Sequence, residues 1–328
     1  HPPTPPNYTG LYSSAASDVY KRQYHDFRSS GHSHSMFNGC FVALVTPFTA
    51  QGEIDFSALR GLVDFHLGQG TNGLVIAGTT GESVSLTQTE FCDILDRVVE
   101  QVAGRLPVIA GTGSASTRKS VEQTQLAAAH GADAALVVTP YYNRPMQPGL
   151  ESHFRTVADG SDIPIILYNV PSRTSVDILP ETVARLSEHG QIAGIKEAVA
   201  DAGRVRELLE LSQKSFVVLS GDDGSCLQSM KSGAHGVISV AANVAPGPMA
   251  QMCAAARRQD WDRAEGLNSA MQKLFDILMI ETNPIPVKWA LFEMNLLGPH
   301  IRLPMTRLGR EFREPLRQCL LELELIPA

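Results

Sequence analysis

The chain has 328 residues, of which 43% are hydrophobic and 19% are charged. This balance is typical of a folded globular protein and excludes disordered and fibrous classes. Lys and Arg number 27 against 34 for Asp and Glu, which gives a net charge of −7. Because no basic cluster occurs, nucleic acid and anionic membranes are not expected partners. No apolar run approaches the roughly 18 residues of a membrane span, so an integral membrane protein is not expected either.

The first 35 residues differ from the rest of the chain. Residues 1–35 are rich in Pro, Ser, His and Tyr, with no apolar periodicity and no apolar stretch of the roughly 7–15 residues found in a secretory signal. We expect them to be a non-native or disordered leader, with the native start at Met36. The five cysteines are widely spaced and include no C-x-x-C pair, which disfavours a disulfide framework or zinc site and favours a cytoplasmic location.

From Phe41 onward, short apolar runs alternate with longer amphipathic stretches. Near-continuous hydrophobicity is typical of strands buried on both faces of a parallel sheet. The predicted strands cover residues 41–47, 73–78, 107–111, 134–140, 164–169, 192–196, 216–221 and 236–240. The clearest helical patterns between them cover residues 56–67, 89–102, 120–130 and 180–189. Eight alternating units predict an α/β fold that closes into a (β/α)8 TIM barrel.

The residues after the eighth predicted strand are mostly helical in pattern, and the clearest segments are 261–280 and 286–297. Asn283-Pro284-Ile285-Pro286 separates these segments, because proline has no N–H to give to a helix interior. We therefore predict a leader over residues 1–35, a barrel over 36–258 and a small C-terminal helical domain over 259–328.

Catalytic groups of TIM barrels lie at the C-terminal ends of the strands, and Lys196 closes the apolar run of the sixth predicted strand. A lysine kept from water favours its neutral amine, which can attack a carbonyl and form a Schiff base. Alternatively, Lys196 could snorkel to solvent or pair with a carboxylate. Glu197 is not the expected partner, since adjacent strand residues point to opposite faces.

Other candidate groups follow neighbouring strands. Tyr168 ends the fifth predicted strand, so its hydroxyl could reach Lys196 and relay protons, or its ring could simply fill the core. Gly78-Thr79-Thr80-Gly81 could direct backbone N–H groups at a carboxylate, or could be an ordinary turn. Arg173 could hold a carboxylate with two hydrogen bonds, or could lie in solvent.

Neither metal nor nucleotide binding is indicated. Asp222 and Asp223 have no His or third acid nearby, so a turn is favoured over a metal site. Gly111-Thr112-Gly113 lacks the third glycine of a dinucleotide fingerprint, which argues against nucleotide binding.

Three motifs occur together in chain order: Gly78-Thr79-Thr80-Gly81-Glu82, Tyr168-Asn169-Val170-Pro171-Ser172-Arg173-Thr174 and Gly194-Ile195-Lys196-Glu197. With residues 140–145 and 283–289, they make the chain resemble the dihydrodipicolinate (4-hydroxy-tetrahydrodipicolinate) synthase family of class I pyruvate-dependent aldolases. The resemblance runs from Met36 to the C-terminus. It implies a lyase of diaminopimelate and lysine biosynthesis that condenses pyruvate with L-aspartate-4-semialdehyde, without metal or cofactor.

The resemblance also implies the catalytic groups. Lys196 would form the imine with pyruvate, and Tyr168, Thr79 and Tyr142 would form a proton relay. In the family the tyrosine matching Tyr142 comes from the neighbouring subunit. The resemblance therefore implies a homo-oligomer, typically a tetramer built from two dimers.

Substrate contacts follow in the same way. Thr79 and Thr80 would bind the pyruvate carboxylate, and Arg173 would bind the carboxylate of the second substrate. Gly221 and Ile238 would line the substrate pocket.

Two alternative functions remain open: a related aldolase that acts on another substrate, and a barrel that binds carboxylates without catalysis. N-acetylneuraminate lyases and keto-deoxy sugar acid aldolases share the lysine and the tyrosine, but the lyases usually carry Ser-Thr in place of Thr79-Thr80 and lack an arginine matching Arg173. A non-catalytic barrel that binds carboxylates is disfavoured, because such a protein need not retain the lysine and the whole proton relay.

Lysine-inhibited members of the family carry His, Asn and Glu around a second pocket at a subunit interface. The matching positions here hold Gln88, Phe91, Ala115 and Lys119. Phe91 cannot accept a hydrogen bond and Lys119 would repel an ammonium group, although Ser83 and Tyr141 are retained. We therefore expect weak or no feedback inhibition by lysine.

Overall fold

Eight parallel strands close into a barrel in the order β1-β2-β3-β4-β5-β6-β7-β8 within residues 36–213 and 215–327, which the computed structural model describes. The strands are β1 (Gly39–Ala43), β2 (Gly73–Ile76), β3 (Val108–Gly111), β4 (Ala134–Val138), β5 (Ile165–Asn169), β6 (Ile192–Glu197), β7 (Val217–Ser220) and β8 (Gly236–Ser239). The predicted TIM barrel is therefore confirmed, whereas the expectation for the leader lies outside the described residues.

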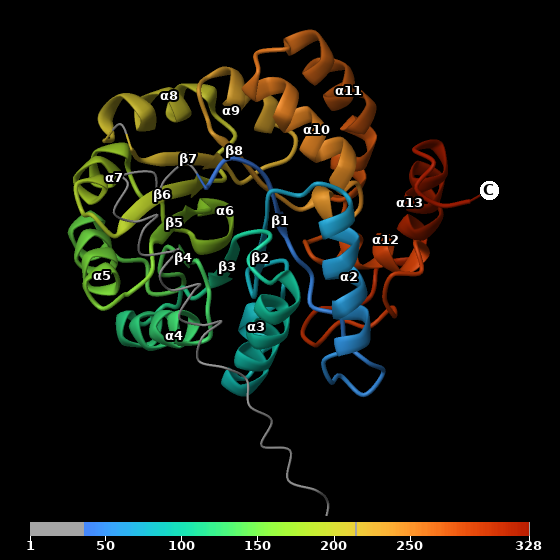
Figure 1. Cartoon of the computed structure of the whole chain (residues 1–328), viewed down its shortest axis with the longest axis horizontal. Helices are drawn as coiled ribbons and strands as arrows, with labels where there is room; N and C mark the ends of the chain where they lie inside the picture. Colours follow the sequence, from blue (N-terminus) through green and yellow to red (C-terminus); the bar gives the residue numbers. More distant parts are fainter. Residues whose placement is uncertain (1–35, 214, 328) are drawn as a thin grey trace, which may run out of the picture. The chain divides into compact units, whose positions relative to one another are not determined.

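Helices surround the strands (Figure 1). They are α2 (Phe56–Gly68), α3 (Gln88–Val102), α4 (Thr117–Ala129), α5 (Gln147–Asp159), α6 (Pro171–Thr174), α7 (Pro180–Ser187), α8 (Ala202–Leu211), α9 (Cys226–Lys231) and α10 (Pro246–Arg257), with the 3-10 turns η1 (Ser83–Ser85) and η2 (Ala241–Asn243). Local sequence sets their ends. Helix α3 begins with a capping box in which Thr87 and Glu90 satisfy each other's backbone N–H groups.

Strand β1 ends earlier than predicted, at Ala43 instead of residue 47. Beyond it, the side chain of Asn243 takes the place of a neighbouring strand. Its Nδ2 donates to Ala43 O at 2.8 Å, and its Oδ1 accepts from Val45 N at 3.1 Å. The apolar run thus continues past the end of the strand ladder, which explains why its hydrophobicity gave too late an end.

The C-terminal helices are α11 (Trp261–Ile277), α12 (Ile285–Glu293) and α13 (Arg310–Glu322). The predicted break around Asn283-Pro284 separates α11 from α12, as expected. Residues from Phe37 onward form one compact unit, and the boundary at 258/259 stays a prediction. None of the helices in residues 36–213 and 215–327 is long and apolar enough to cross a membrane.

Candidate active site

The C-terminal ends of the strands surround a pocket of about 290 Å³. Six residues predicted for the site line it: Thr79, Thr80, Tyr168, Arg173, Lys196 and Gly221. They come from four separate strand ends, those of β2, β5, β6 and β7, and the segments that follow them. The barrel topology therefore brings together residues that are far apart in the sequence.

Lys196 and Tyr168 face each other in this pocket. Parallel pairing sets Tyr168 of β5 beside Lys196 of β6, and Lys196 Nζ lies 4.3 Å from the centroid of the Tyr168 ring. Each residue is only 6% exposed. Among the carboxylates of the described residues, none forms an ion pair with Lys196. The amine is therefore shielded from water and has no counter-charge within the part of the chain that the structure describes.

Gly221 gives the lysine side chain its space. A Cβ at residue 221 would lie 3.0 Å from Lys196 Cε and 2.9 Å from Ala198 Cβ. The Gly221 N–H also donates to Glu197 O at 2.7 Å, which joins the end of β7 to β6. A larger side chain would have to displace the lysine or this backbone contact.

The Thr79-Thr80 segment is held in place from behind. Thr46 Oγ1 donates to Gly81 O at 2.7 Å, and the Lys288 ammonium pairs with the Glu82 carboxylate at 2.5 Å. Glu82 itself has a φ of 55°, a left-handed conformation that non-glycine residues rarely adopt. The turn is therefore fixed by a buried ion pair, unlike an ordinary solvent-exposed turn.

Asn283 joins the two expected carboxylate-binding regions. It opens one of the segments that carry the family resemblance, but no role at the site was predicted for it from the sequence. Its Nδ2 donates to Thr80 Oγ1 at 3.0 Å, and its carbonyl accepts from Arg173 Nη2 at 3.1 Å. Asn283 lines the pocket and is 7% exposed. Its Oδ1 has no hydrogen-bond partner among the described residues, so this residue of the pocket lining has an unused acceptor.

Asp222 and Asp223 accept hydrogen bonds from the segments that follow β7 and β8. Asp222 Oδ2 accepts from the Ser225 N–H at 2.9 Å and from its hydroxyl at 2.6 Å. Asp223 Oδ2 accepts from Val240 N and Ala241 N, at 3.0 and 2.8 Å. Burial raises the pKa of Asp223. In residues 36–213 and 215–327, no cluster of three His, Cys, Asp or Glu side chains suited to a metal ion occurs.

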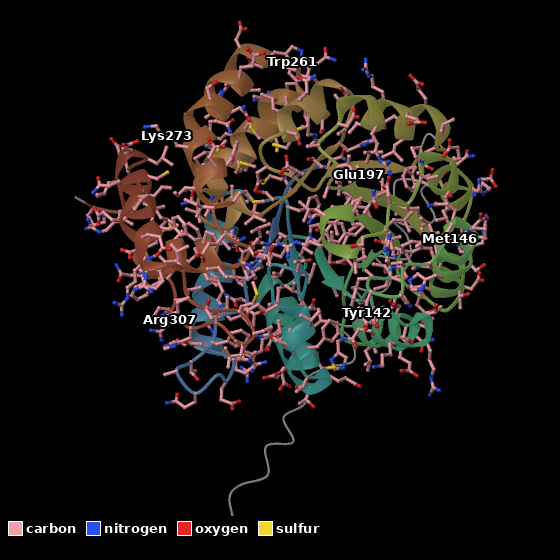
Figure 2. The ribbon with its side chains drawn as sticks, turned by 180° about the vertical axis from the view of Figure 1, so that it is seen from behind. Tyr142, Met146, Glu197, Trp261, Lys273 and Arg307 are labelled. Carbon is pink, nitrogen blue, oxygen red and sulfur yellow. The ribbon has the colours of Figure 1, made fainter. Side chains whose placement is uncertain are left out.

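Tyr142 and Ile238 do not line this pocket. Tyr142 lies between β4 and α5 (Figure 2), is 94% exposed and has a φ of 71°. Ile238 is buried in β8. Their expected roles stay predictions. In contrast, Phe275, Asp276, Leu278 and Met279 of the α11 region line the pocket, although their sequence pattern is that of any amphipathic helix.

A closed (β/α)8 barrel with a buried lysine at its strand ends is the arrangement of a class I, Schiff-base-forming aldolase, and this is the class of the protein. A structure of a chloride-inhibited dihydrodipicolinate synthase from Acinetobacter baumannii complexed with pyruvate has a TM-score of 0.87 and 45% identity, covering 88% of this chain and 99% of that one. A monomeric dihydrodipicolinate synthase variant has a TM-score of 0.88 and 38% identity, covering 89% and 99%.

Sequence comparison gives the family. A 4-hydroxy-tetrahydrodipicolinate synthase of Ectopseudomonas mendocina is 55% identical over 285 residues, which are 87% of this chain and 98% of that one. The model of the Dihydrodipicolinate synthetase family matches residues 36–323. The chain therefore belongs to this family, as its motifs indicated.

Proposed function

We propose that this protein is a lyase that condenses pyruvate with L-aspartate-4-semialdehyde to 4-hydroxy-tetrahydrodipicolinate in diaminopimelate and lysine biosynthesis. The observation that carries the proposal is the buried Lys196 amine, 4.3 Å from the Tyr168 ring and without an ion-pair partner among the described residues. An amine without a counter-charge can give its lone pair to a ketone. Family membership and the relatives' names support the choice of substrates.

The chemistry begins at Lys196. Its amine attacks the ketone carbon of pyruvate, and loss of one water gives an imine. Loss of a methyl proton then gives an enamine, whose carbon forms a bond with the aldehyde carbon of the semialdehyde. Finally, the amino group of the semialdehyde attacks the imine carbon, closes the ring and releases the Lys196 amine.

The other residues bind and move protons. Tyr168 lies beside the amine, so its hydroxyl passes protons to and from the reacting atoms, together with Thr79 and Tyr142. Thr79 and Thr80 hold the pyruvate carboxylate, and Arg173 holds that of the semialdehyde. The Asn283 Oδ1, which has no partner among the described residues, accepts a hydrogen bond from the semialdehyde amine. No metal or cofactor is needed for these steps.

We further propose that the protein acts as a cytoplasmic homo-oligomer, a tetramer built from two dimers. The exposed Tyr142 cannot serve its own pocket from its position between β4 and α5, so a neighbouring subunit would receive it. Val84 and Met146 are also strongly exposed apolar residues, at 83% and 78%, and contact with a neighbour would bury them. Sizing by light scattering tests this, and an active monomer would contradict it.

We also propose that lysine inhibits the enzyme weakly or not at all. A second pocket of about 290 Å³ is lined by Ser83, Gln88, Phe91, Lys119 and Tyr141, among others. It offers a phenyl ring and an ammonium group where a lysine ligand needs hydrogen-bond acceptors. Half-inhibition at sub-millimolar lysine in the steady-state assay would contradict this proposal.

Borohydride reduction in the presence of pyruvate tests the main proposal. The peptide that contains Lys196 should gain the mass of the reduced pyruvate adduct, and Lys196→Ala should gain none. A coupled assay then compares aspartate semialdehyde with a keto-deoxy sugar acid and N-acetylneuraminate. Turnover of a sugar acid alone would favour the related aldolases, and the absence of any adduct would favour a carboxylate-binding barrel.

A further inference from the structure

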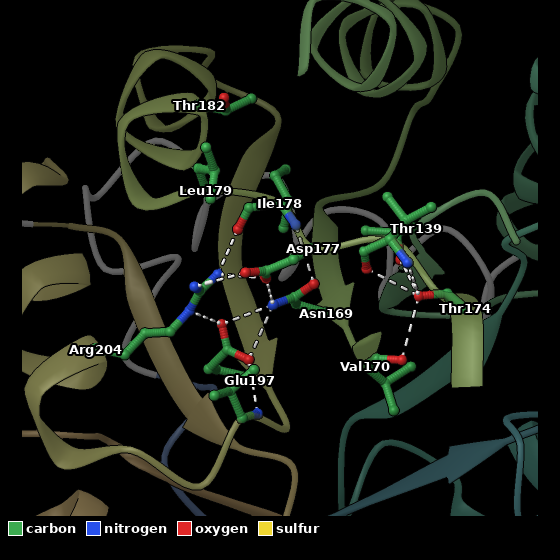
Figure 3. Close-up of polar contacts among 12 residues, drawn as sticks. Thr139, Asn169, Val170, Thr174, Asp177, Ile178, Leu179, Thr182, Glu197 and Arg204 are labelled. Carbon is green, nitrogen blue, oxygen red and sulfur yellow. Dashed lines mark hydrogen bonds and ion pairs between the residues drawn. The ribbon is translucent and has the colours of Figure 1, made fainter. Parts of the chain in front are cut away.

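Four polar side chains near the ends of β5 and β6 form a cluster joined by hydrogen bonds and ion pairs (Figure 3). These are Asn169, Asp177, Glu197 and Arg204, here called the outer cluster. Asn169 and Glu197 directly follow the two pocket residues on β5 and β6, so their side chains point to the opposite face of the sheet. None of the four lines the pocket. The reaction proposed above assigns them no role.

Glu197 is the centre of the outer cluster, and its side chain is fully buried. Its carboxylate accepts from Arg204 Nε at 2.9 Å, from Val199 N at 2.8 Å and from Asn169 Nδ2, which lies 3.1 Å from each oxygen. Burial raises the pKa of Glu197, whereas Arg204 and these hydrogen bonds lower it. Because all these partners are donors, the ionised carboxylate is the form that satisfies them.

The same cluster holds the segment after α6. Both terminal nitrogens of Arg204 donate to the Asp177 carboxylate, at 3.0 and 2.7 Å. Asn169 Nδ2 donates to Asp177 Oδ1 at 2.7 Å, and Asn169 Oδ1 accepts from Ile178 N at 3.2 Å. Asp177 lies four positions beyond Arg173 in the sequence. The outer cluster therefore fixes one end of the segment that carries Arg173.

Thr174, which directly follows Arg173, is fixed as well. Thr139 Oγ1 donates to Thr174 Oγ1 at 3.2 Å, and the Thr174 hydroxyl donates to Val176 O at 2.9 Å. Arg173 itself is exposed, and its side chain has one hydrogen bond within the described residues, to Asn283 O. Its position relative to Lys196 is thus set by its backbone, which runs from the end of β5 before it to Thr174 and Asp177 after it.

From these contacts we infer that the outer cluster consists of positioning residues that hold the lysine and the arginine in one fixed relation. Glu197 and Asn169 fix the pairing of β5 with β6, and hence Tyr168 against Lys196. Asp177 and Arg204 fix the Arg173 segment to the same two strand ends. The inference rests on the proposed function, because it assigns Lys196 to pyruvate and Arg173 to the second substrate.

The inference predicts different effects on the two sides of the cluster. Glu197→Gln keeps the shape of the side chain but turns an amide N–H₂ toward groups that are all donors. The β5–β6 pairing then shifts, and a displacement near 1 Å at a reacting group costs up to about a hundredfold in rate. We expect imine formation at saturating pyruvate to slow by about tenfold or more.

Asp177→Asn tests the side of the Arg173 segment. Asp177 is partly exposed, so this variant tolerates the change even if Glu197→Gln fails to fold. Glu197 keeps its contacts with Asn169, Val199 and Arg204. We therefore expect the KM for aspartate semialdehyde to rise by about tenfold, while the rate of imine formation stays within about twofold of the wild type.

Glu151→Gln is the matched control. Glu151 also contacts two arginines, Arg155 and Arg185, and joins α5 to α7 away from the pocket. Its substitution should change neither imine formation nor KM, whatever it does to the melting temperature. The measurements are borohydride-quenched imine formation, steady-state kinetics and thermal unfolding of each full-length variant.

Four outcomes decide the matter. The split between the two variants supports positioning. Equal melting-temperature losses in Glu197→Gln and Glu151→Gln, with imine formation unchanged in both, would overturn it. So would an Asp177→Asn variant that slows imine formation as much as it raises KM. If the wild type itself traps no pyruvate, the proposed function fails, and the cluster loses its role with it.

Discussion

Two lysines of this protein are buried to a similar extent, but only one of them has a carboxylate as a partner. Lys196 is 6% exposed and Lys288 is 4% exposed. Each places its Nζ 4.3 Å from the centroid of an aromatic ring, that of Tyr168 or that of Phe48. Lys288 also pairs with Glu82 and donates to Thr46 O at 2.9 Å. Lys196 has no ion pair with any described residue.

The difference separates a structural lysine from a reactive one. Burial lowers the pKa of Lys288, and the Glu82 carboxylate opposes that effect. The paired ammonium therefore serves to hold the turn that carries Thr79 and Thr80. Burial alone does not make a lysine a nucleophile, and what distinguishes Lys196 is that it is buried without a carboxylate.

The largest expected effect separates the two lysines by chemistry. Lys196→Met should abolish the pyruvate imine and lower turnover by several orders of magnitude. The free energy of unfolding should stay the same or rise, because methionine fills a similar volume and leaves no partner unpaired. Borohydride trapping and urea unfolding measure the two effects. A stability loss above about 2 kcal/mol would show that Lys196 is also structural.

Substitution of the other lysine, Lys288, should affect the stability of the protein instead of its chemistry. Lys288→Met leaves the buried Glu82 carboxylate without its partner, so the free energy of unfolding should fall by about 3–5 kcal/mol. The double variant Lys288→Met/Glu82→Gln should regain part of that loss, because it removes the unpaired charge. The imine should still form at high pyruvate in both variants, and its absence would make Lys288 part of the chemistry.

Arg173 sharpens the comparison, because it is a cation whose proposed partner is the substrate. Arg173→Ala should lower kcat/KM for aspartate semialdehyde by roughly ten- to a hundredfold, as expected for a lost charged hydrogen bond of about 1.5–3 kcal/mol. Imine formation with pyruvate should remain. Parallel steady-state and trapping assays check the division of roles, which an equal loss of both would refute.

The smallest expected effect concerns two buried histidines, whose surroundings favour the neutral imidazole. Burial lowers the pKa of His66 and of His153 to about 4, against about 6.5 in an unfolded chain. As the pH falls from about 6.5 toward 4, the two imidazoles become protonated in the unfolded chain but not in the folded one. The free energy of unfolding is therefore highest above about pH 6.5 and decreases between about pH 6.5 and pH 4. Between pH 7 and pH 5.5 each imidazole should cost about 1 kcal/mol.

Urea unfolding at the two pH values measures this loss. His66→Asn keeps a polar side chain that does not titrate, so it should reduce the loss between pH 7 and pH 5.5 by about 1 kcal/mol. An unchanged slope in this variant would mean that other groups cause the effect.

The sequence was informative about the fold because strands buried on both faces leave a simple pattern. Each apolar run overlaps one strand of the barrel. The ends of the strands were less certain, because hydrophobicity does not show where the hydrogen bonding between neighbouring strands stops. Strand β4, for instance, ends at Val138, the last β4 residue paired with β5, although the predicted strand extends to residue 140.

The candidate site was only partly visible in the sequence. Lys196 stood out as a charge that closes an apolar run, and its motif carried Tyr168 and Arg173 with it. Asn283 could not be found in this way, since it contacts Thr80 across 203 residues of chain. Its place depends on how the segment between α11 and α12 packs against the strand ends, and no residue pattern encodes that packing.

The side chain of Asn243 has a consequence for how the chain is synthesised and folds. It completes the hydrogen bonding of β1 through Ala43 O, 200 residues earlier, and β8 pairs with β1 just before it. During translation, the edge of β1 therefore stays unpaired until nearly the whole barrel has left the ribosome. Closing such a long loop is slow, and the open edge is prone to aggregation. We therefore expect a chain truncated before β8 to collect in inclusion bodies or to associate with chaperones.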